Sequence, residues 1–279
     1  MKKFVLNADD LGKSENHNRA IANGFKFGIL KSTSVMANMP CYNDALWNVI
    51  RPNPTLGVGV HLNLIEGKAL NSDLDLLCDK KRNFNNSYLK LILNSTSKKF
   101  LSQIEKEFRS QIERCILDFK PTHLDSHVHT HGIPPIFELV CKLADEYGIE
   151  QVRTQDEKFY YINDKKYDRK TYNINLIKVL LLKYFTFINK TKIKKYNLKT
   201  NDYILGVSYT SMMDSTTVLE GLKNFKDENI LIEALIHPCL YEDTRIKDCH
   251  FEEYLITKDE MLKDLIEKNL NFKIVNYQE

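Results

Sequence analysis

The sequence predicts an α/β fold, an irregular TIM-like (β/α) barrel that forms a single domain. Apolar, β-rich runs alternate with helical patterns from one end of the chain to the other, which is typical of parallel β/α architecture. Seven or eight such units fit into the 279 residues, and this number favours a barrel over an open sheet. Ionisable residues recur where predicted strands end, which is where such barrels carry their sites.

The individual elements follow from periodicity and from start and stop signals. The long helix has Phe100, Ile104, Phe108 and Ile112 at helical spacing, whereas residues 65–97 are polar and predict a loop. The predicted strands are 3–8, 32–39, 56–64, 122–129, 150–155, 203–209, 231–238 and 272–277. The predicted helices are 14–29, 42–54, 98–119, 134–149, 174–188, 215–226 and 257–269.

Residues 156–202 differ in composition from the rest of the chain. They are rich in Lys, Tyr and Asn and poor in Gly, and they predict an insertion into the single domain of residues 1–279. We expect one apolar helix within it, near 174–188, followed by a basic connector at 189–199. The lysines are interpreted as a solvated face.

Composition and targeting signals limit the partners and the location. A formal net charge of +3 is too small to imply a nucleic-acid partner. The six cysteines fit neither a zinc finger nor a disulfide framework, which predicts reduced thiols in a cytoplasmic protein. The first apolar run is too short for a signal peptide, and Lys178 and Lys183 interrupt the most apolar internal stretch. No membrane partner is expected, and a homodimer is the base-rate expectation.

Residues 122–131 contain four of the eight histidines. Because strand residues alternate between faces, we expect His123, Asp125, His127 and His129 to share one side. Imidazole is the commonest metal ligand near neutral pH. Residues two apart on a strand lie about 7 Å apart, so only one or two of these side chains can bind one ion. The others would orient ligands or contact substrate.

Other ionisable residues are expected at the same rim of the barrel. They end four further predicted strands, and they are Asp9 and Asp10, His61, Arg153 and His237. Adjacent carboxylates point in different directions, so one of the two can bind a metal while the other faces its water. Two histidines with one carboxylate leave coordination positions open, which is the catalytic pattern. His237 could then serve as a general acid, and the residues indicate a mononuclear metal hydrolase.

Four motifs resemble those of the YdjC-like family in order and in approximate spacing. They are NADDLG at 7–12, GVHLNL at 59–64, PTHLDSHVHTH at 121–131 and HP at 237–238. The resemblance implies an irregular (β/α) barrel, one divalent cation and hydrolytic removal of acetyl groups from N-acetylated sugars. Chitooligosaccharide-like or other N-acetylhexosamine-containing carbohydrates are the implied small-molecule substrates. Ligand chemistry suits Zn²⁺, and the resemblance points at least as much to Mg²⁺.

The same resemblance implies a role for each matching position. Asp10, His61 and His127 match the metal ligands. Asp9 matches the general base, and His237 matches a late histidine that acts as acid. Asp125, His129 and Arg153 are expected to orient ligands, the base or the substrate, while His123 and His131 receive no role. The insertion at 156–202 departs from the short family form, and this puts the exact sugar in doubt.

Two other functions are consistent with parts of the pattern. Metal-dependent phosphoesterases built on barrels also carry histidine pairs, but these stand at the first strand and bind two or three metals, whereas the first strand here ends in NADD. A non-catalytic sugar- or metal-binding protein would be indicated by a broken motif, and no motif residue is missing. Counting metal ions and assaying acetate release separates these alternatives.

Overall fold

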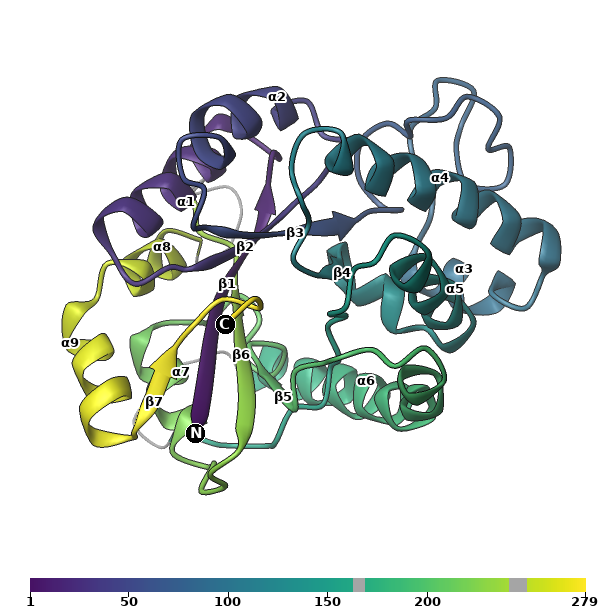
Figure 1. Cartoon of the computed structure of the whole chain (residues 1–279). Coiled ribbons are helices and arrows are strands. Elements are labelled where there is room, and N and C mark those ends of the chain that lie inside the picture. Colours follow the sequence, from purple (N-terminus) through teal and green to yellow (C-terminus); the bar gives the residue numbers. More distant parts are fainter. Residues whose placement is uncertain (163–168, 241–249) are drawn as a thin grey trace.

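The structure, a computed structural model, describes residues 1–162, 169–240 and 250–279. Its centre is a parallel sheet of seven strands in the order β4–β3–β2–β1–β6–β5, with β7 beside β1 (Figure 1). The strands are β1 (Lys2–Leu11), β2 (Ser32–Val35), β3 (Gly57–Leu62), β4 (Leu124–Ser126), β5 (Tyr203–Leu205), β6 (Ile230–Ile236) and β7 (Phe272–Ile274). Each of these strands lies within or overlaps a predicted strand.

Single bridges continue the sheet beyond β4. Val152 pairs with Leu124 of β4, and Gln151 pairs with Lys199, shortly before β5. The Arg153 N–H donates to the Leu124 carbonyl over 3.0 Å, and the Val152 N–H donates to the Lys199 carbonyl over 3.0 Å. The sheet therefore curls into a barrel-like shape, as predicted. The predicted strand at 150–155 is wrong in extent, because it consists only of these bridges, and the described strands number seven rather than the eight of a regular barrel.

Helices surround the sheet (Figure 1). They are α1 (Glu15–Phe27), α2 (Tyr42–Ala45), α3 (Tyr88–Asn94), α4 (Lys98–Ile116), α5 (Pro134–Glu146), α6 (Arg169–Lys195), α7 (Ser215–Leu222), α8 (His250–Thr257) and α9 (Glu260–Asp264). Ser14 caps α1 as predicted, because its hydroxyl accepts from the His17 N–H, and Gly28 follows the last helical residue. The predicted helix at 257–269 is instead divided between the end of α8, α9 and a π-turn at Leu265–Asn269.

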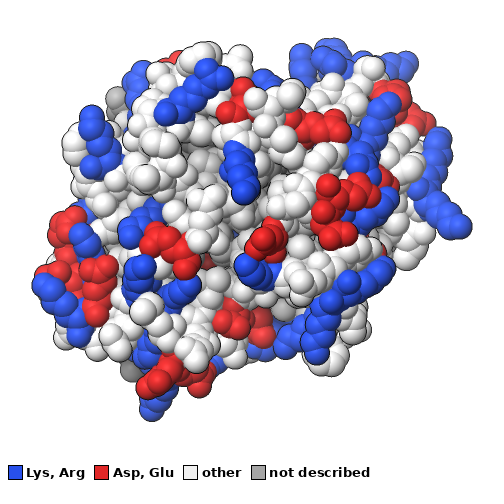
Figure 2. Space-filling view, in the orientation of Figure 1, with Lys and Arg blue, Asp and Glu red and all other residues white. Residues whose placement is uncertain are grey.

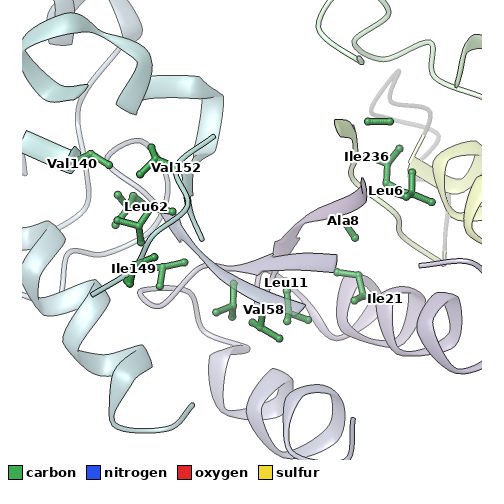
Figure 3. Packing of buried hydrophobic residues seen from close by; sticks show 14 of the residues in the cluster. Leu6, Ala8, Leu11, Ile21, Val58, Leu62, Val140, Ile149, Val152 and Ile236 are labelled. Atoms are coloured by element: carbon green, nitrogen blue, oxygen red, sulfur yellow. The ribbon is translucent and has the colours of Figure 1, made fainter. Parts of the chain in front are cut away.

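The two faces of β1 have opposite chemistry. Phe4, Leu6 and Ala8 lie in the apolar layer between sheet and helices, and Figure 3 shows Leu6 and Ala8 together with Ile236 of β6. Asn7 and Asp9 alternate with them and are also buried. The inside of the curled sheet is thus polar and shielded from water, so its groups must find partners within the protein.

The predicted insertion contains a longer helix than expected. The prediction placed it near 174–188, but α6 runs from Arg169 to Lys195. It packs on α5, and the Asn189 side chain donates to the Gly132 carbonyl over 2.8 Å. The polar stretch 65–97, predicted as a loop, contains α3. No helix in the described part of the chain is long and apolar enough to cross a bilayer. The five described cysteines are free, and Cys249 lies outside the described residues.

Candidate metal centre and active site

A β-bulge in β1 directs the side chains of the adjacent Asp9 and Asp10 to different partners. Ala8 pairs with Thr33 and Leu11 with Val35, so β1 contains one residue more than β2 over this interval. Asp10 takes up the extra length with a φ of 66°. As a result, both carboxylates are buried at the carboxyl end of β1, but they have different partners.

Asp10 lies between two histidines. Its Oδ1 is 3.0 Å from His127 Nδ1 and 3.5 Å from His61 Nε2, while Lys13 Nζ is 3.1 Å from Oδ2. Ligand atoms of Asp10, His61 and His127 all lie within 4.8 Å of one another. Burial disfavours the charged carboxylate, but His127 and Lys13 outweigh this, so the pKa of Asp10 is well below its usual range.

His61 is oriented by a second carboxylate. Its Nδ1 is 2.9 Å from Asp125 Oδ1, and because a carboxylate only accepts, Nδ1 carries the proton and donates. The Nε2 lone pair is then directed toward Asp10. A carboxylate behind a histidine in this way fixes the tautomer of metal-binding imidazoles. Burial disfavours the charged ring, but Asp125 outweighs it and the pKa of His61 is raised.

Asp9 forms a two-pronged ion pair with Arg153. Arg153 Nη1 donates to Oδ2 over 2.8 Å and Nη2 donates to Oδ1 over 2.7 Å. Asn7 and Ser34 also donate to Oδ1, whereas Oδ2 has no other partner among the described residues. Burial opposes ionisation of Asp9, but the Arg153 guanidinium outweighs it and lowers the pKa of Asp9. Arg153 therefore holds Asp9 charged and fixed in position.

Arg153 is fully buried and contacts two more carboxylates. Its Nη2 is 2.8 Å from Asp125 Oδ2 and also pairs with Glu233 of β6. The Tyr277 hydroxyl donates to Glu233 from the opposite side. Burial raises the pKa of Glu233 to about 7 despite the guanidinium. Glu233 and Tyr277 were not predicted from the sequence, although a glutamate inside the apolar run LIEALI is a signal for a buried, paired carboxylate.

The histidine-rich stretch does not continue as a strand, and the predicted shared face is wrong for His127 and His129. β4 ends at Ser126, and a 3₁₀ turn follows over His127–Gly132. Val128 and His129 inside it have φ angles of 55° and 56°. The turn brings His127 to Asp10 and leaves His129 Nδ1 buried, with no hydrogen-bond partner in the described part of the chain. Burial, with Arg153 nearby, lowers the pKa of His129 to about 3.

The other two histidines of the stretch, His131 and His123, are buried and contact groups that hold the site in place. His131 Nε2 is 2.9 Å from the Arg153 carbonyl, which ties the turn to the arginine. His123 is fully buried, with its Nε2 3.8 Å from Asp125. Its ring lies against Gly59 of β3, where a Cβ atom would collide with it. The glycine in GVGV is therefore explained by the space that the His123 ring needs.

His237 follows β6 and is anchored by a glutamate of α8. Its Nδ1 is 3.2 Å from Glu253 Oε2, and its backbone N–H donates to the same atom. Nε2 makes no hydrogen bond to the described residues. Burial favours the neutral ring, but the hydrogen bond and charge of Glu253 outweigh it, and the pKa of His237 is raised to about 9. His237 is therefore a protonated acid at neutral pH.

Some of these groups line one cavity of about 320 Å³. Asp9 of β1, His127 and His129 of the 3₁₀ turn and His237, which follows β6, supply ionisable lining, together with Lys178 of α6. The remaining lining is mostly apolar, and it comprises Tyr88, Ser126, Val128, Leu181, Leu182, Val207, Thr210 and Leu235. The Tyr88 hydroxyl is buried without a partner among the described residues. It was not predicted, and it can hydrogen-bond to a ligand in this cavity.

Known proteins similar to this chain carry one recurring name. A carbohydrate deacetylase from Clostridium beijerinckii is 35% identical over 147 residues, which cover 53% of this chain and 58% of the relative. One from Brevibacillus brevis is 36% identical over 147 residues, 57% of its length. These first relatives are thus matched over less than two thirds of their length. A carbohydrate deacetylase from Thermoanaerobacter pseudethanolicus is 27% identical over 283 residues, covering 99% of this chain and 98% of the relative.

The fold and the family are supported along nearly the whole chain. A crystal structure from Enterococcus faecalis V583, described as a candidate cellobiose-phosphate cleavage protein, superposes with a TM-score of 0.73 at 22% identity and covers 99% of this chain and 98% of its own. The family described as YdjC-like protein matches residues 3–268. The resemblance stated from four short motifs is therefore confirmed, and the chain belongs to the YdjC-like family.

Proposed function

We propose that this protein is a metal-dependent hydrolase that removes N-acetyl groups from acetylated carbohydrates. The observation that supports it most is that His127 of the Asp10–His61–His127 group lines the same cavity as Asp9 and His237. The family membership and the relatives named carbohydrate deacetylases support the same reaction class. Chitooligosaccharide-like or other N-acetylhexosamine-containing carbohydrates are the proposed substrates.

The residues at the site fit one divalent cation. Asp10, His61 and His127 offer one carboxylate oxygen and two imidazole nitrogens that face a common point, a donor set suited to Mg²⁺ or Zn²⁺. A bound cation would supply a Lewis acid and lower the pKa of a water molecule. In a second possible group, Asp9, His61 and Asp125, the Arg153 guanidinium pairs with both carboxylates and offsets part of their negative charge. One ion rather than two favours the deacetylase over a binuclear phosphoesterase.

Asp9 is the proposed general base. Its Oδ2 retains a free lone pair, and the residue lines the cavity beside His127. Arg153 holds the carboxylate in one orientation, so proton transfer from water requires no reorientation of the base. The lowered pKa keeps Asp9 ionised at neutral pH, which is the protonation state that a base requires. Asp125 and Arg153 are positioning residues in this proposal, because they act through His61 and Asp9.

His237 is the proposed general acid. Glu253 occupies Nδ1, so Nε2 is the nitrogen that can donate a proton to the departing amine. A raised pKa keeps that proton in place until the C–N bond breaks. His129 and the Tyr88 hydroxyl are proposed to hydrogen-bond to the acetamide or the sugar, because both have unpartnered polar atoms beside the same cavity.

The test measures acetate release from diacetylchitobiose, longer chitooligosaccharides and N-acetylglucosamine conjugates, with and without added divalent cations. Asp9→Asn should retain one metal ion per chain but lower turnover by about two to four orders of magnitude. Asp264→Asn, at an exposed aspartate of α9, is the matched control and should behave as wild type. Near-normal turnover of Asp9→Asn would show that Asp9 is not the base, and two or three bound ions would favour the phosphoesterase.

The domain boundaries and the location are also proposals. We propose that residues 1–279 form one catalytic domain and that 156–202 is an insertion that covers the site, because α6 supplies Lys178, Leu181 and Leu182 to the cavity wall. A cytoplasmic location remains the expectation.

A further inference from the structure

The outward face of α6 is apolar and uncovered by the described chain. Ile177 is 68% exposed, Leu180 56%, Tyr184 60% and Phe187 71%. The opposite face of the same helix is buried through Val179, Leu182 and Phe185 and needs no further cover. A surface helix of a soluble protein normally has one apolar face, which is buried, and a polar outer face. In α6 the outer face is apolar as well.

The charges of α6 all have the same sign. Its 27 residues include one arginine and seven lysines and no aspartate or glutamate. At about 100° per residue, Lys183, Lys190 and Lys194 fall along one margin of the apolar face, whereas Lys178 falls on the side that lines the cavity. Lys183 pairs with Asp156, but Lys190 and Lys194 form no ion pair with the described residues. An exposed apolar face with unpaired lysines along one margin has the charge that attracts a helix to an anionic bilayer surface.

The apolar face continues into the catalytic cavity. Leu181 is 36% exposed on the outside of α6 and also lines the cavity, next to Lys178 and Leu182. Val207 and Leu235 extend this apolar wall toward Asp9 and His237. Sugar hydroxyls placed against Leu181, Leu182 and Val207 would lose their hydrogen bonds to water, whereas Tyr88 and Thr210 of the same lining can hydrogen-bond to the sugar. The wall instead suits an apolar group close to the acetamide.

We propose that α6 rests on an anionic membrane surface and that the substrate is an N-acetylated amino sugar attached to an apolar lipid-like chain. The chain would lie along the Leu181–Leu182 wall while the acetamide reaches the cavity. The substrate half of this inference rests on the proposed deacetylase function, whereas the membrane contact is independent of it. The proposed membrane contact replaces the expectation from sequence that the lysines form a solvated face and that the protein has no membrane partner. One face of the whole molecule, by contrast, carries intermixed charges of both signs (Figure 2).

Membrane contact is tested by flotation of the full-length protein with vesicles of phosphatidylcholine, with or without phosphatidylglycerol. The wild type should float only with the anionic vesicles, and high salt should weaken binding. The variant Ile177→Ser/Leu180→Ser/Phe187→Ser should bind at least about ten-fold more weakly. The matched control Leu93→Ser/Leu117→Ser/Met261→Ser removes equally exposed side chains elsewhere and should bind as wild type. Each of Lys190→Gln and Lys194→Gln should weaken binding about five-fold, whereas Lys178→Gln, on the cavity side of α6, should not.

Two outcomes would overturn the membrane contact. One is failure of the wild type to bind anionic vesicles. The other is a wild-type dimer in sedimentation velocity that the α6 triple variant converts to monomer, because the apolar face would then cover a second copy. Circular dichroism of both triple variants establishes that they are folded.

The substrate class is tested with two soluble-enzyme assays in parallel. The kcat/KM for acetate release from a dodecyl N-acetylglucosaminide presented in anionic vesicles should exceed that from diacetylchitobiose. The α6 triple variant should lose this preference and keep the wild-type rate on diacetylchitobiose. Equal rates on both substrates, unchanged by the variant, would overturn the substrate class. Failure to release acetate from either substrate would refute the deacetylase function, while vesicle flotation would still report on the α6 contact.

Discussion

The pH dependence of catalysis should be set by one carboxylate that never touches the substrate. Glu253 of α8 accepts from both the ring Nδ1 and the backbone N–H of His237. Among the described residues, the other titratable groups near His237 include Asp10 and Asp9 of β1, His17, His129 and the ring of His250, whose centroid is 5.8 Å away. Glu253 raises the pKa of His237 first through its hydrogen bond and then through its charge, and Glu253→Gln removes the charge and leaves only a weaker, neutral acceptor.

The magnitude follows from the pKa of His237, which is raised from 6.5 to about 9. Without the Glu253 charge, the pKa should return toward 6.5. At pH 8 the protonated fraction of His237 then falls from about 90% to about 3%, so the acid-dependent rate should fall about 30-fold. At pH 5.5 both forms are mostly protonated, and the variant should be nearly as active as wild type.

The assay is kcat/KM for acetate release between pH 5 and 10, with the exposed neighbour Glu252→Gln as control. The alkaline limb of the profile should move by about two pH units in Glu253→Gln and stay in place in the control. A loss of activity that is equal at every pH, or an unmoved alkaline limb, would refute the role of His237 as acid. Stability should change in the same sense: the folded state binds the proton more tightly, so this contribution is complete below pH 6.5 and is lost as pH rises through about 9.

Three further predictions concern stability and metal binding. Arg153→Met leaves three buried carboxylates without their cation, so the free energy of unfolding in urea should fall by about 3–5 kcal/mol; a loss below about 1 kcal/mol would mean that the network relaxes without it. Gly59→Ala places a methyl group against the His123 ring and should cost about 1–3 kcal/mol in thermal unfolding, unless the ring can shift. Titration calorimetry should show no metal binding by His127→Ala but one ion, bound about 10–100-fold more weakly, in Asp125→Asn; the reverse pattern would move the ion to the second group.

The sequence predicted which strand ends carry the polar groups because strand alternation and the parallel β/α rule are local properties. β1, β3 and β6 lie where their apolar runs predicted them, and Asp9, His61 and His237 follow from that placement. The contacts within the polar interior of the sheet were harder to predict from the sequence. Arg153 meets Asp9 across 144 positions in the chain, and no periodicity encodes such a contact.

The histidine-rich stretch was misinterpreted for a physical reason. Alternation assumes extended backbone, and Val128 and His129 leave it for the left-handed region. Valine in particular gives no signal for a positive φ, because its branched side chain disfavours that conformation. Such strain is sustained only where neighbouring contacts fix the turn, here through His131 and the Arg153 carbonyl. The extent of α6 was underestimated because basic residues extend it beyond the apolar stretch.

The single extra residue in β1 gives the neighbouring residues Asp9 and Asp10 different contacts. Because the bulge turns Asp9 toward Arg153 and Asp10 toward His127, a substitution at one position leaves the surroundings of the other largely unchanged. In the proposed mechanism, a substitution of Asp9 would therefore change proton transfer, and a substitution of Asp10 would change cation affinity. Deleting one residue between Ala8 and Leu11 would remove the bulge. Only one aspartate could then point inward, and it would have to serve both as the partner of Arg153 and as the partner of His127.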